Sequence, residues 1–480
     1  MFKICNMDLI GREAEIESLN NLLNTTKSEL CAVVGRRRVG KTFLIKSCFK
    51  DQFYIQFTGL FNADLDQHLG RFWKAMKEQL KIPNLPIIYS WFDAFDFLKE
   101  HIENSRIRKK KIIFLDEFPW MATHKSSFLT AFTDFWNSWA SSRNDIVIVI
   151  CGSSASWMIN NIFKNKGGLY NRVTERIELH PFNLKETEDF FKAKHLKLKR
   201  DDIIKFYMVM GGIPFYLDQV RADESADQAI QRLYFKKNGI LKLEYNELFT
   251  SLYDNAASHE SIVYSLSEHT TGLTRTQLIK LNSLITGGGL TRILDELELS
   301  GFITRYVPFG KKSKDAIYKL TDPFTLFYVK YVLHNTFRSG NIWSQLTKTP
   351  SWQSWSGLAF ENICLLHTDN IKRKLKIEGI YTEESKWQHK GNDEMYGAQI
   401  DLIIDRADNV INLCEIKYAA TPFVIDKDYS ARLNQKHASF QFFSKTRKAI
   451  FVTIITANGL VKNKYSLDLV TNEVTANDLF

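Results

Sequence analysis

Long apolar runs are absent from this sequence of 480 residues. Its strongly apolar stretches, such as Ile146–Cys151, are far shorter than the roughly 20 residues of a membrane-spanning helix. Near the start, Asn6 and Asp8 stand where a signal peptide would need an apolar run. We therefore expect a cytoplasmic protein with no membrane partner.

Cysteine is also scarce. The six cysteines form no Cys-x-x-Cys pair, and no histidine stands at a spacing that indicates zinc. Several cysteines lie in apolar runs, where a reduced thiol in the core is the ordinary state. The sequence therefore favours neither a disulfide framework nor a zinc domain, and it shows no internal repeat.

The remaining composition is that of a folded chain. Hydrophobic residues make up 44% and charged residues 25%, which excludes wholesale disorder. At about 150 residues per domain, the length predicts about three domains. Lys and Arg total 64 against 54 Asp and Glu, a formal net charge of +10. This charge permits a polyanion partner without demonstrating one.

Residues 30–47 contain a phosphate-loop pattern. A short β-type run, Leu30–Val34, leads into Gly35-x-x-x-x-Gly40-Lys41-Thr42, and an apolar helical pattern follows. Glycines let backbone N–H groups surround phosphate oxygens, and the helix N-terminus adds positive potential. Lys41 is expected to reach the β- and γ-phosphates, and the Thr42 hydroxyl to ligate Mg²⁺. The predicted nucleotide contacts of the loop are Gly35, Arg38, Val39, Gly40, Lys41, Thr42 and Phe43.

A second acidic motif follows another buried-type strand. Ile112–Leu115 is continuously apolar, and Asp116 and Glu117 come directly after it. Ligands bind at the carboxyl ends of strands in open α/β sheets. We expect Asp116 to hold Mg²⁺ and Glu117 to orient the attacking water, although an Asp-Glu pair here would also suit a helix cap.

A third strand, Asp145–Cys151, leads to Gly152-Ser153-Ser154. A polar side chain at this tip, Ser153 or Ser154, is suited to sensing the γ-phosphate, and the alternative is an N-cap of the next helix. Further on, Arg172 precedes a strand-like run and is either a finger that stabilises transition-state charge or a surface arginine.

In this order the motifs resemble the archaeal-type ATPase family, which is related to the STAND and AAA+ NTPases. The resemblance covers about residues 8–240, with Asn171 standing where glycine commonly precedes the arginine. It implies that ATP is the nucleotide, that Arg12 lies near the base, and that Pro214 belongs to a helical lid near the adenine. The motifs that carry it are Ile10-Gly11-Arg12-Glu13, the phosphate loop, Leu115-Asp116-Glu117, Gly152-Ser153-Ser154, Tyr170-Asn171-Arg172 and Gly211-Gly212-Ile213-Pro214.

The middle of the chain has the pattern of a winged helix-turn-helix. Three helical stretches within residues 258–300 precede two strand-like runs, 302–307 and 316–320, around the basic loop Gly310–Lys314. If this segment binds DNA, the helix near residues 289–299 enters the major groove and the loop lysines contact phosphates. The alternative is a structural winged helix that packs on the ATPase.

The C-terminal third contains spaced carboxylates and a lysine. Two strands flank a polar turn at residues 405–409, with Asp401 on the first strand and Glu415 and Lys417 on one face of the second. A turn centred on Ala407 would place Asp401 opposite Leu413 and diagonal to Glu415, within reach of one cation. Metal-assisted phosphodiester hydrolysis needs this set, and Glu361 is a further candidate carboxylate.

This set resembles the PD-(D/E)xK nuclease superfamily over about residues 350–460, with Gln399-Ile400 where many members have a proline before the aspartate. The resemblance implies a catalytic role for Glu361, Asp401, Glu415 and Lys417, with Asp401 and Glu415 binding the metal. A degenerate fold that only binds a partner is the alternative.

The predicted fold is α/β: a P-loop NTPase domain (1–180) with a helical lid (181–250), a winged helix-turn-helix with a linker (251–345), and a C-terminal restriction-endonuclease-like α/β domain (346–480). The expected function is an ATPase that requires ATP and Mg²⁺ and couples nucleotide state to DNA binding or cleavage. The alternative is a STAND-like signalling or regulatory ATPase switch whose C-terminal domain is a non-catalytic, partner-binding module. Besides ATP and DNA, the expected partners are a second copy of the chain or another protein.

Overall fold

The computed structural model describes residues 9–82, 84–123, 125–164, 168–253, 255–282, 285, 287–334 and 340–480. Contacts between Cα atoms divide the chain into two units, Met1–Pro181 and Phe182–Phe480, each of which is described by itself. The segments predicted as lid, winged helix and C-terminal domain fall inside the second unit, except for Pro181 at the start of the lid.

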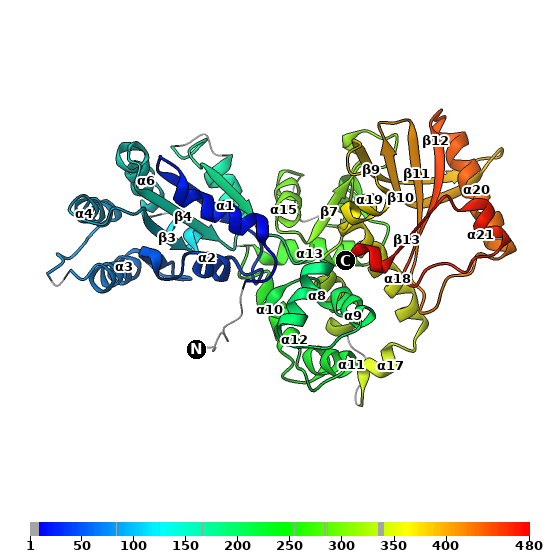
Figure 1. Ribbon diagram of the computed structural model, residues 1–480, viewed down its shortest axis with the longest axis horizontal. Helices are drawn as coiled ribbons and strands as arrows, with labels where there is room; N and C mark the ends of the chain where they lie inside the picture. Colours follow the sequence, from blue (N-terminus) through cyan, green and yellow to red (C-terminus); the bar gives the residue numbers. More distant parts are fainter. Residues whose placement is uncertain are drawn as a thin grey trace. The chain divides into compact units, whose positions relative to one another are not determined.

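A parallel sheet forms the centre of the first unit (Figure 1). All of its strand pairs are parallel. Every residue of β1, β3 and β4 is buried, as expected for continuous apolar strands covered on both faces. The predicted α/β fold with a parallel sheet is thus confirmed for this part. The strand order is β2 (Phe53–Thr58), β3 (Lys111–Asp116), β4 (Ile146–Gly152), β1 (Glu29–Val34) and β5 (Glu175–Glu178).

Aromatic side chains fill the core between this sheet and its helices. Trp91 and Phe95 of α4 contact Phe128 of α6, and Phe72 of α3 contacts Trp91. These side chains pack with alternate residues of the strands in one cluster. The helices of the unit are α1 (Glu13–Asn24), α2 (Lys41–Phe49), α3 (Leu65–Gln79), α4 (Trp91–Glu103), α5 (Phe118–Met121), α6 (Phe128–Asp134) and α7 (Ala155–Met158).

The second unit begins with a helical segment. Phe182 N donates to Gly212 O at 2.7 Å, and a Cβ on Gly212 would lie 1.8 Å from the Phe182 carbonyl oxygen. This close approach of two backbones explains why glycine precedes Ile213. The helices here are α8 (Leu184–Ala193), α9 (Arg200–Met210), α10 (Pro214–Leu217), α11 (Ala226–Ile230) and α12 (Ile240–Leu248).

The described residues between 256 and 320 form a small three-stranded antiparallel sheet and three α-helices. Its strand order is β6-β8-β7. Leu290, Leu294 and Leu297 of α15 are buried, which the helical spacing in the sequence predicts. The elements are α13 (Ala256–Ser267), β6 (Leu273–Thr274), α14 (Arg275–Leu281), α15 (Gly287–Leu299), β7 (Ile303–Tyr306) and β8 (Ile317–Leu320).

The last part of the chain contains a mixed five-stranded sheet, drawn in yellow to red in Figure 1. The order is β13-β12-β11-β10-β9, in which β9, β10 and β11 are antiparallel and β11, β12 and β13 are parallel. Its strands are β9 (Thr382–Gly391), β10 (Tyr396–Arg406), β11 (Val410–Lys417), β12 (Ala449–Thr456) and β13 (Asn472–Thr475). Its helices are α16 (Pro323–Phe327), α17 (Ile342–Leu346), α18 (Pro350–Leu366), α19 (Thr368–Leu375), α20 (Lys427–Ser444) and α21 (Lys464–Leu469).

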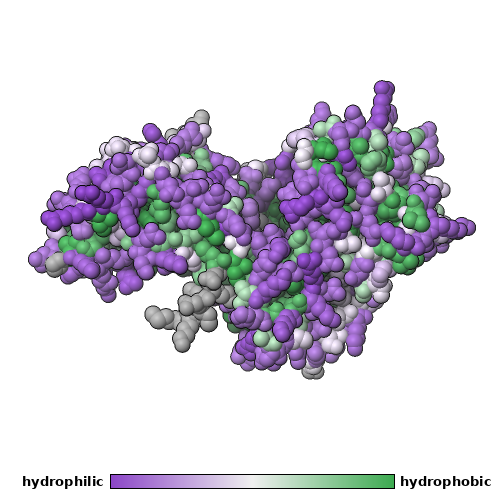
Figure 2. Space-filling view, viewed as in Figure 1, coloured by the Kyte–Doolittle hydropathy of each residue, from purple (hydrophilic) through white to green (hydrophobic). Residues whose placement is uncertain are grey.

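Short 3-10 or π-helical turns complete the described structure: Lys50–Gln52, Phe135–Trp139, Ala140–Ser142, Ile159–Phe163, Gln231–Phe235, Ser313–Asp315, Tyr328–Leu333 and Ala476–Leu479. Figure 2 shows a mostly hydrophilic face with apolar side chains in separate groups. Within the described residues, no helix combines the length and the apolar character needed to cross a membrane.

Candidate nucleotide site and carboxylate–lysine cluster

Two glycines shape the phosphate loop between β1 and α2. Gly35 has φ +153°, and a Cβ there would lie 2.4 Å from the Leu179 carbonyl oxygen. Gly40 has φ +95° and directly precedes Lys41, the first residue of α2. A side chain would clash at Gly35 and would be strained at Gly40. Glycine therefore lets the loop turn tightly, and the N-terminus of α2 faces the space that the loop encloses.

Lys41 lies inside this loop. Its Nζ donates to Gly35 O at 2.8 Å, to Arg36 O at 2.9 Å and to Ser153 Oγ at 3.3 Å. Burial lowers the pKa of Lys41, while the acidic groups of Cys151, Glu117 and Asp116 act in the opposite direction. The ammonium group therefore lies among acceptors that a phosphate oxygen could replace.

Thr42 and Asp116 meet at the end of β3. The Thr42 hydroxyl lies 3.1 Å from Oδ1 and 3.0 Å from Oδ2 of Asp116. Oδ1 also accepts from the Cys151 thiol at 2.8 Å and from the Glu117 backbone N–H at 3.0 Å. A hydroxyl and a carboxylate held together are oxygen ligands of the kind that Mg²⁺ takes beside a nucleotide, so these two residues fit the predicted ion.

Ser153 links Lys41 to Glu117. Its hydroxyl donates to Glu117 Oε1 at 2.6 Å, and its backbone N–H donates to Oε2 at 3.1 Å. Glu117 itself has φ +47°, an unusual conformation for a non-glycine residue at the end of a strand. Ser153 thus contacts both the loop lysine and the predicted water-orienting glutamate.

The other predicted nucleotide residues differ in their surroundings. Arg12 is buried, and its Nη2 donates to His180 O at 2.5 Å. Val39 is buried, whereas Phe43 and Arg38 are half-buried. Arg172 is exposed in the turn before β5. Pro214 begins α10 in the second unit, and its place near the adenine stays a prediction, as do the roles of Arg12 and Arg172.

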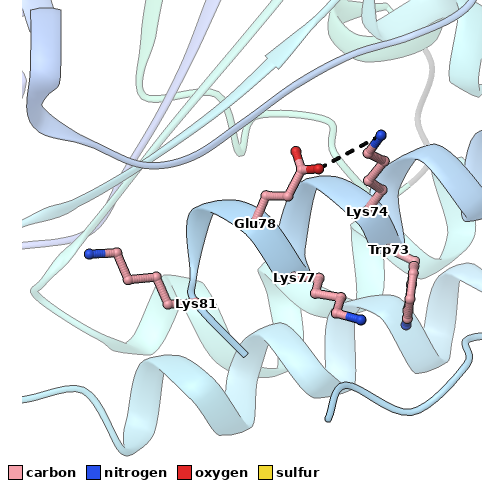
Figure 3. A pocket seen from close by; sticks show the side chains of 5 residues that line it. All are labelled: Trp73, Lys74, Lys77, Glu78 and Lys81. Atoms are coloured by element: carbon pink, nitrogen blue, oxygen red, sulfur yellow. Dashed lines mark ion pairs between the residues drawn. The ribbon is translucent and has the colours of Figure 1, made fainter. Parts of the chain in front are cut away.

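A shallow hollow lies on α3 and the residues after it (Figure 3). Lys77 Nζ lies 4.9 Å from the centre of the Trp73 ring, and Lys74 pairs with Glu78 at 3.7 Å. None of the predicted site residues lines this hollow, so we assign it no role in nucleotide binding.

In the C-terminal sheet the predicted hairpin is present, but its predicted register is wrong. Leu413 pairs with Ile403, whereas a turn centred on Ala407 would pair it with Asp401. The turn centres one residue later, because β10 continues to Arg406 and Asn409 takes the left-handed conformation with φ +65° before β11 starts. Asp401 consequently lies at the level of Glu415, and its Oδ2 accepts from Ile416 N at 3.0 Å.

Asp401 and Glu415 have opposite pKa shifts. Burial, followed by the charges of Glu415 and Glu361, raises the pKa of Asp401 to about 6. Burial alone would also raise the pKa of Glu415, but Lys417 and Lys436 hold it below its ordinary value. The causes are visible in the contacts: Glu415 lies 2.8 Å from Lys417 and 2.7 Å from Lys436, and it accepts from the Tyr429 hydroxyl at 2.8 Å.

Glu361 is engaged by two lysines. Its Oε1 lies 3.0 Å from Lys319 Nζ and also pairs with Lys386. Burial lowers the pKa of Lys319 to about 8, with a further contribution from the charge of Lys386. Glu361 therefore lies near enough to Asp401 for its charge to raise the pKa of that aspartate. The carboxylate of Glu361 is at the same time paired with lysines.

We call Glu361, Asp401, Glu415 and Lys417 the carboxylate–lysine cluster. In the part of the chain that the structure describes, no three His, Cys, Asp or Glu side chains are arranged to hold a metal ion. Asp401 and Glu415 offer two carboxylates suited to a divalent cation, but Glu361 does not complete the set in this arrangement.

Sequence reasoning missed Tyr429, Lys319 and Lys386. Tyr429 and Lys436 are seven residues apart and lie on one face of α20, so the helical period places them together. Lys319 offers no such signal, because its partner Glu361 lies 42 residues further along the chain.

Comparisons with known proteins bear on the N-terminal part of the chain. Residues 9–220 match a family described as an ATPase domain predominantly from Archaea. Over 402 residues the chain is 25% identical to an uncharacterized protein of Methanocaldococcus jannaschii, with 82% of this chain and 83% of that protein covered.

Two solved structures are similar to most of the chain. A Walker-type ATPase of Pyrococcus abyssi gives a TM-score of 0.51 at 17% identity, covering 69% of this chain and 99% of its own. The ORC2 protein of Aeropyrum pernix, in its ADPNP-ADP complexes, gives 0.44 at 17% identity, covering 71% and 96%. The family match and the first of these structures confirm the prediction that the N-terminal part of this chain has the fold of a P-loop ATPase domain.

Proposed function

We propose that the protein binds ATP with Mg²⁺ and hydrolyses it at the carboxyl ends of β1, β3 and β4. The observation that carries this proposal is the convergence of Lys41, Thr42, Asp116, Glu117 and Ser153, which come from separate segments and contact one another. Three classes of group needed for phosphoryl transfer are present: a phosphate-binding lysine, oxygen ligands for Mg²⁺ and a carboxylate for water.

Each side chain has a distinct role in this proposal. Lys41 leaves the loop carbonyls and binds the β- and γ-phosphates, and Thr42 and Asp116 hold Mg²⁺, which neutralises charge on the phosphates. Glu117 accepts a hydrogen bond from the attacking water once Ser153 releases it. Ser153 is then free to contact the γ-phosphate. The loop backbone and the first turn of α2 supply further N–H donors.

The role of Glu117 is tested by Glu117→Gln. This variant keeps the shape of residue 117 and one of its two acceptor oxygens but cannot accept a proton, so we expect ATP affinity to be retained and turnover to fall by about 100-fold or more. Phosphate release and nucleotide titration measure the two quantities. Glu78→Gln, an exposed glutamate on α3, is the control and should leave both unchanged. Wild-type turnover in Glu117→Gln would refute the assignment.

For the second unit we propose DNA engagement controlled by the nucleotide state, with residues 256–320 as a winged helix and the last sheet as a nuclease-like domain. The order helix, strand, helix, helix, strand, strand supports the first part. Lys311, Lys312 and Lys314 are exposed at the hairpin tip, where they suit phosphate contacts. The adjacent Asp401, Glu415 and Lys417 support the second part.

Plasmid cleavage in the presence of ATP and either Mg²⁺ or Mn²⁺ tests the nuclease proposal. Asp401→Ala should abolish cleavage, whereas Asp408→Ala, on the exposed turn of the same hairpin, should not. Absence of cleavage with every metal, or cleavage unchanged in Asp401→Ala, would exclude it.

A second candidate is a regulatory switch whose C-terminal part only binds a partner. The lysine contacts of Glu361 and Glu415 favour it, because these carboxylates are already neutralised. Salt discriminates between the two candidates, since DNA binding through several phosphate contacts weakens steeply as salt rises.

A further inference from the structure

The hairpin formed by β7 and β8 packs against the C-terminal sheet. Phe309, in the loop between these strands, donates its N–H to Lys386 O of β9 at 2.9 Å. Its ring lies 5.2 Å from that of Phe440 and packs on the apolar cluster that contains Trp387 and Ile403. The hairpin is therefore anchored to the domain that carries the carboxylate–lysine cluster, through contacts within one unit.

The same hairpin sends a buried lysine to that cluster. Lys319 of β8 is 4% exposed, and its Nζ lies 3.0 Å from Glu361 Oε1. Lys386 binds the same oxygen from β9, and its Nζ lies 5.8 Å from the centre of the Tyr306 ring of β7. Two ammonium groups thus face one carboxylate oxygen.

A structural ion pair does not need this arrangement. One lysine neutralises one carboxylate, and a second, half-buried ammonium group beside the first adds repulsion and desolvation cost. Glu415 is likewise paired with two lysines, Lys417 and Lys436. Ammonium groups therefore supply at Glu361 and Glu415 the positive charge that a divalent cation would otherwise supply.

We propose that Lys319 is an autoinhibitory residue that occupies, together with Lys386, the place of a divalent cation beside Glu361. Tight binding of the cation at Asp401 and Glu415 then requires that the β7–β8 hairpin withdraw Lys319, after which Glu361 joins them as a third ligand. The inference rests on the proposed metal-dependent function and names its regulation. It explains why the three carboxylates lie near one another without forming a metal site among the described residues.

Calorimetric titration of the full chain with Mn²⁺ alone tests this inference. The same titration of Asp401→Asn is subtracted, so that only binding at the cluster is counted. We expect Lys319→Gln to raise Mn²⁺ affinity about tenfold, a moderate value for coupling between two sites. Lys390→Gln removes an exposed lysine from β9, the strand that carries Lys386, and should leave the affinity unchanged.

Two further variants protect the test against misfolding. Lys386→Gln should also raise Mn²⁺ affinity, because it removes the other ammonium group from Glu361. Adding Glu361→Gln to Lys319→Gln should cancel the gain, since the freed ligand is then lost. A Lys319→Gln protein that melts at a lower temperature but binds Mn²⁺ as the wild type does would show a structural lysine and overturn the inference.

The outcomes separate the inference from the function on which it rests. Equal, Asp401-dependent Mn²⁺ binding by the wild type and Lys319→Gln would overturn the inference and leave the metal site standing. Absence of Asp401-dependent binding in the wild type and in both lysine variants would overturn the metal-dependent function and the inference with it.

Discussion

Ser153 connects the lysine of the phosphate loop with the glutamate that we predict to orient water. It contacts Glu117 through its hydroxyl and its backbone N–H, and it accepts a hydrogen bond from Lys41. Any ligand that draws Lys41 away also removes a donor from Ser153. The positions of the lysine and the glutamate are therefore linked by a single hydroxyl, which suits a site where binding must precede hydrolysis.

Asp401 has a testable pH dependence. Its folded-state pKa of about 6 is higher than the ordinary value of an aspartate, so the folded state favours the neutral carboxyl. The corresponding stability is fully present below about pH 4 and is lost as the pH rises through 6. Urea unfolding should show the wild type losing about 2 kcal/mol relative to Asp401→Asn between pH 4 and pH 7. Parallel stability curves for the two proteins would contradict the raised pKa.

At the scale of elements, His367 connects α18 with α8. Its Nε2 accepts from Leu184 N at 3.0 Å, and Nδ1 donates to Ile363 O at 2.8 Å. The ring is therefore neutral, and burial lowers its pKa to about 4. A protonated ring would lose the acceptor that caps the N-terminus of α8.

The sign of this shift is opposite to that of Asp401. Below about pH 6.5, His367 binds a proton in the unfolded chain but not in the folded protein. Stability is therefore lost as the pH falls towards 4. Between pH 7 and pH 5 the wild type should lose about 2 kcal/mol more than His367→Gln, which cannot be protonated. Urea midpoints at the two pH values measure this, and an equal loss in the variant would count against a neutral buried ring.

Strands were predictable where the evidence for them lies in neighbouring residues of the sequence. Leu30–Val34, Ile112–Leu115 and Asp145–Cys151 were identifiable as strands because continuous apolar runs precede their motifs. The first two lie within strands of the parallel sheet, and the third matches β4 except for Asp145, which precedes it. The register of β10 and β11 was not predictable, because it depends on the left-handed Asn409 in the turn. The pairing of Lys319 with Glu361 was equally inaccessible, since it requires the packing of two segments distant in sequence.

At the scale of the whole molecule, the chain combines an ATPase fold with a second unit that carries its own charged cluster. Arg172 is exposed in the first unit, which suits a residue that completes the site of a second copy. We therefore predict that Arg172→Ala retains ATP binding and loses turnover by about tenfold or more.

Mixing two variants tests whether Arg172 acts between copies. Arg172→Ala contributes an intact Glu117, and Glu117→Gln contributes an intact Arg172. If the arginine acts on a neighbouring copy, the mixture should recover part of the phosphate release that each variant lacks alone. A mixture no more active than the sum of its components would restrict Arg172 to its own chain or to the surface.

The central claim is that the phosphate loop binds ATP through Lys41, and calorimetric titration with MgATP tests it most directly. Lys41→Ala should lose measurable binding, because it removes the ammonium group held inside the loop. Lys46→Ala, an exposed lysine on the same helix, should bind as the wild type does. Wild-type affinity in Lys41→Ala, or an equal loss in both variants, would contradict the account.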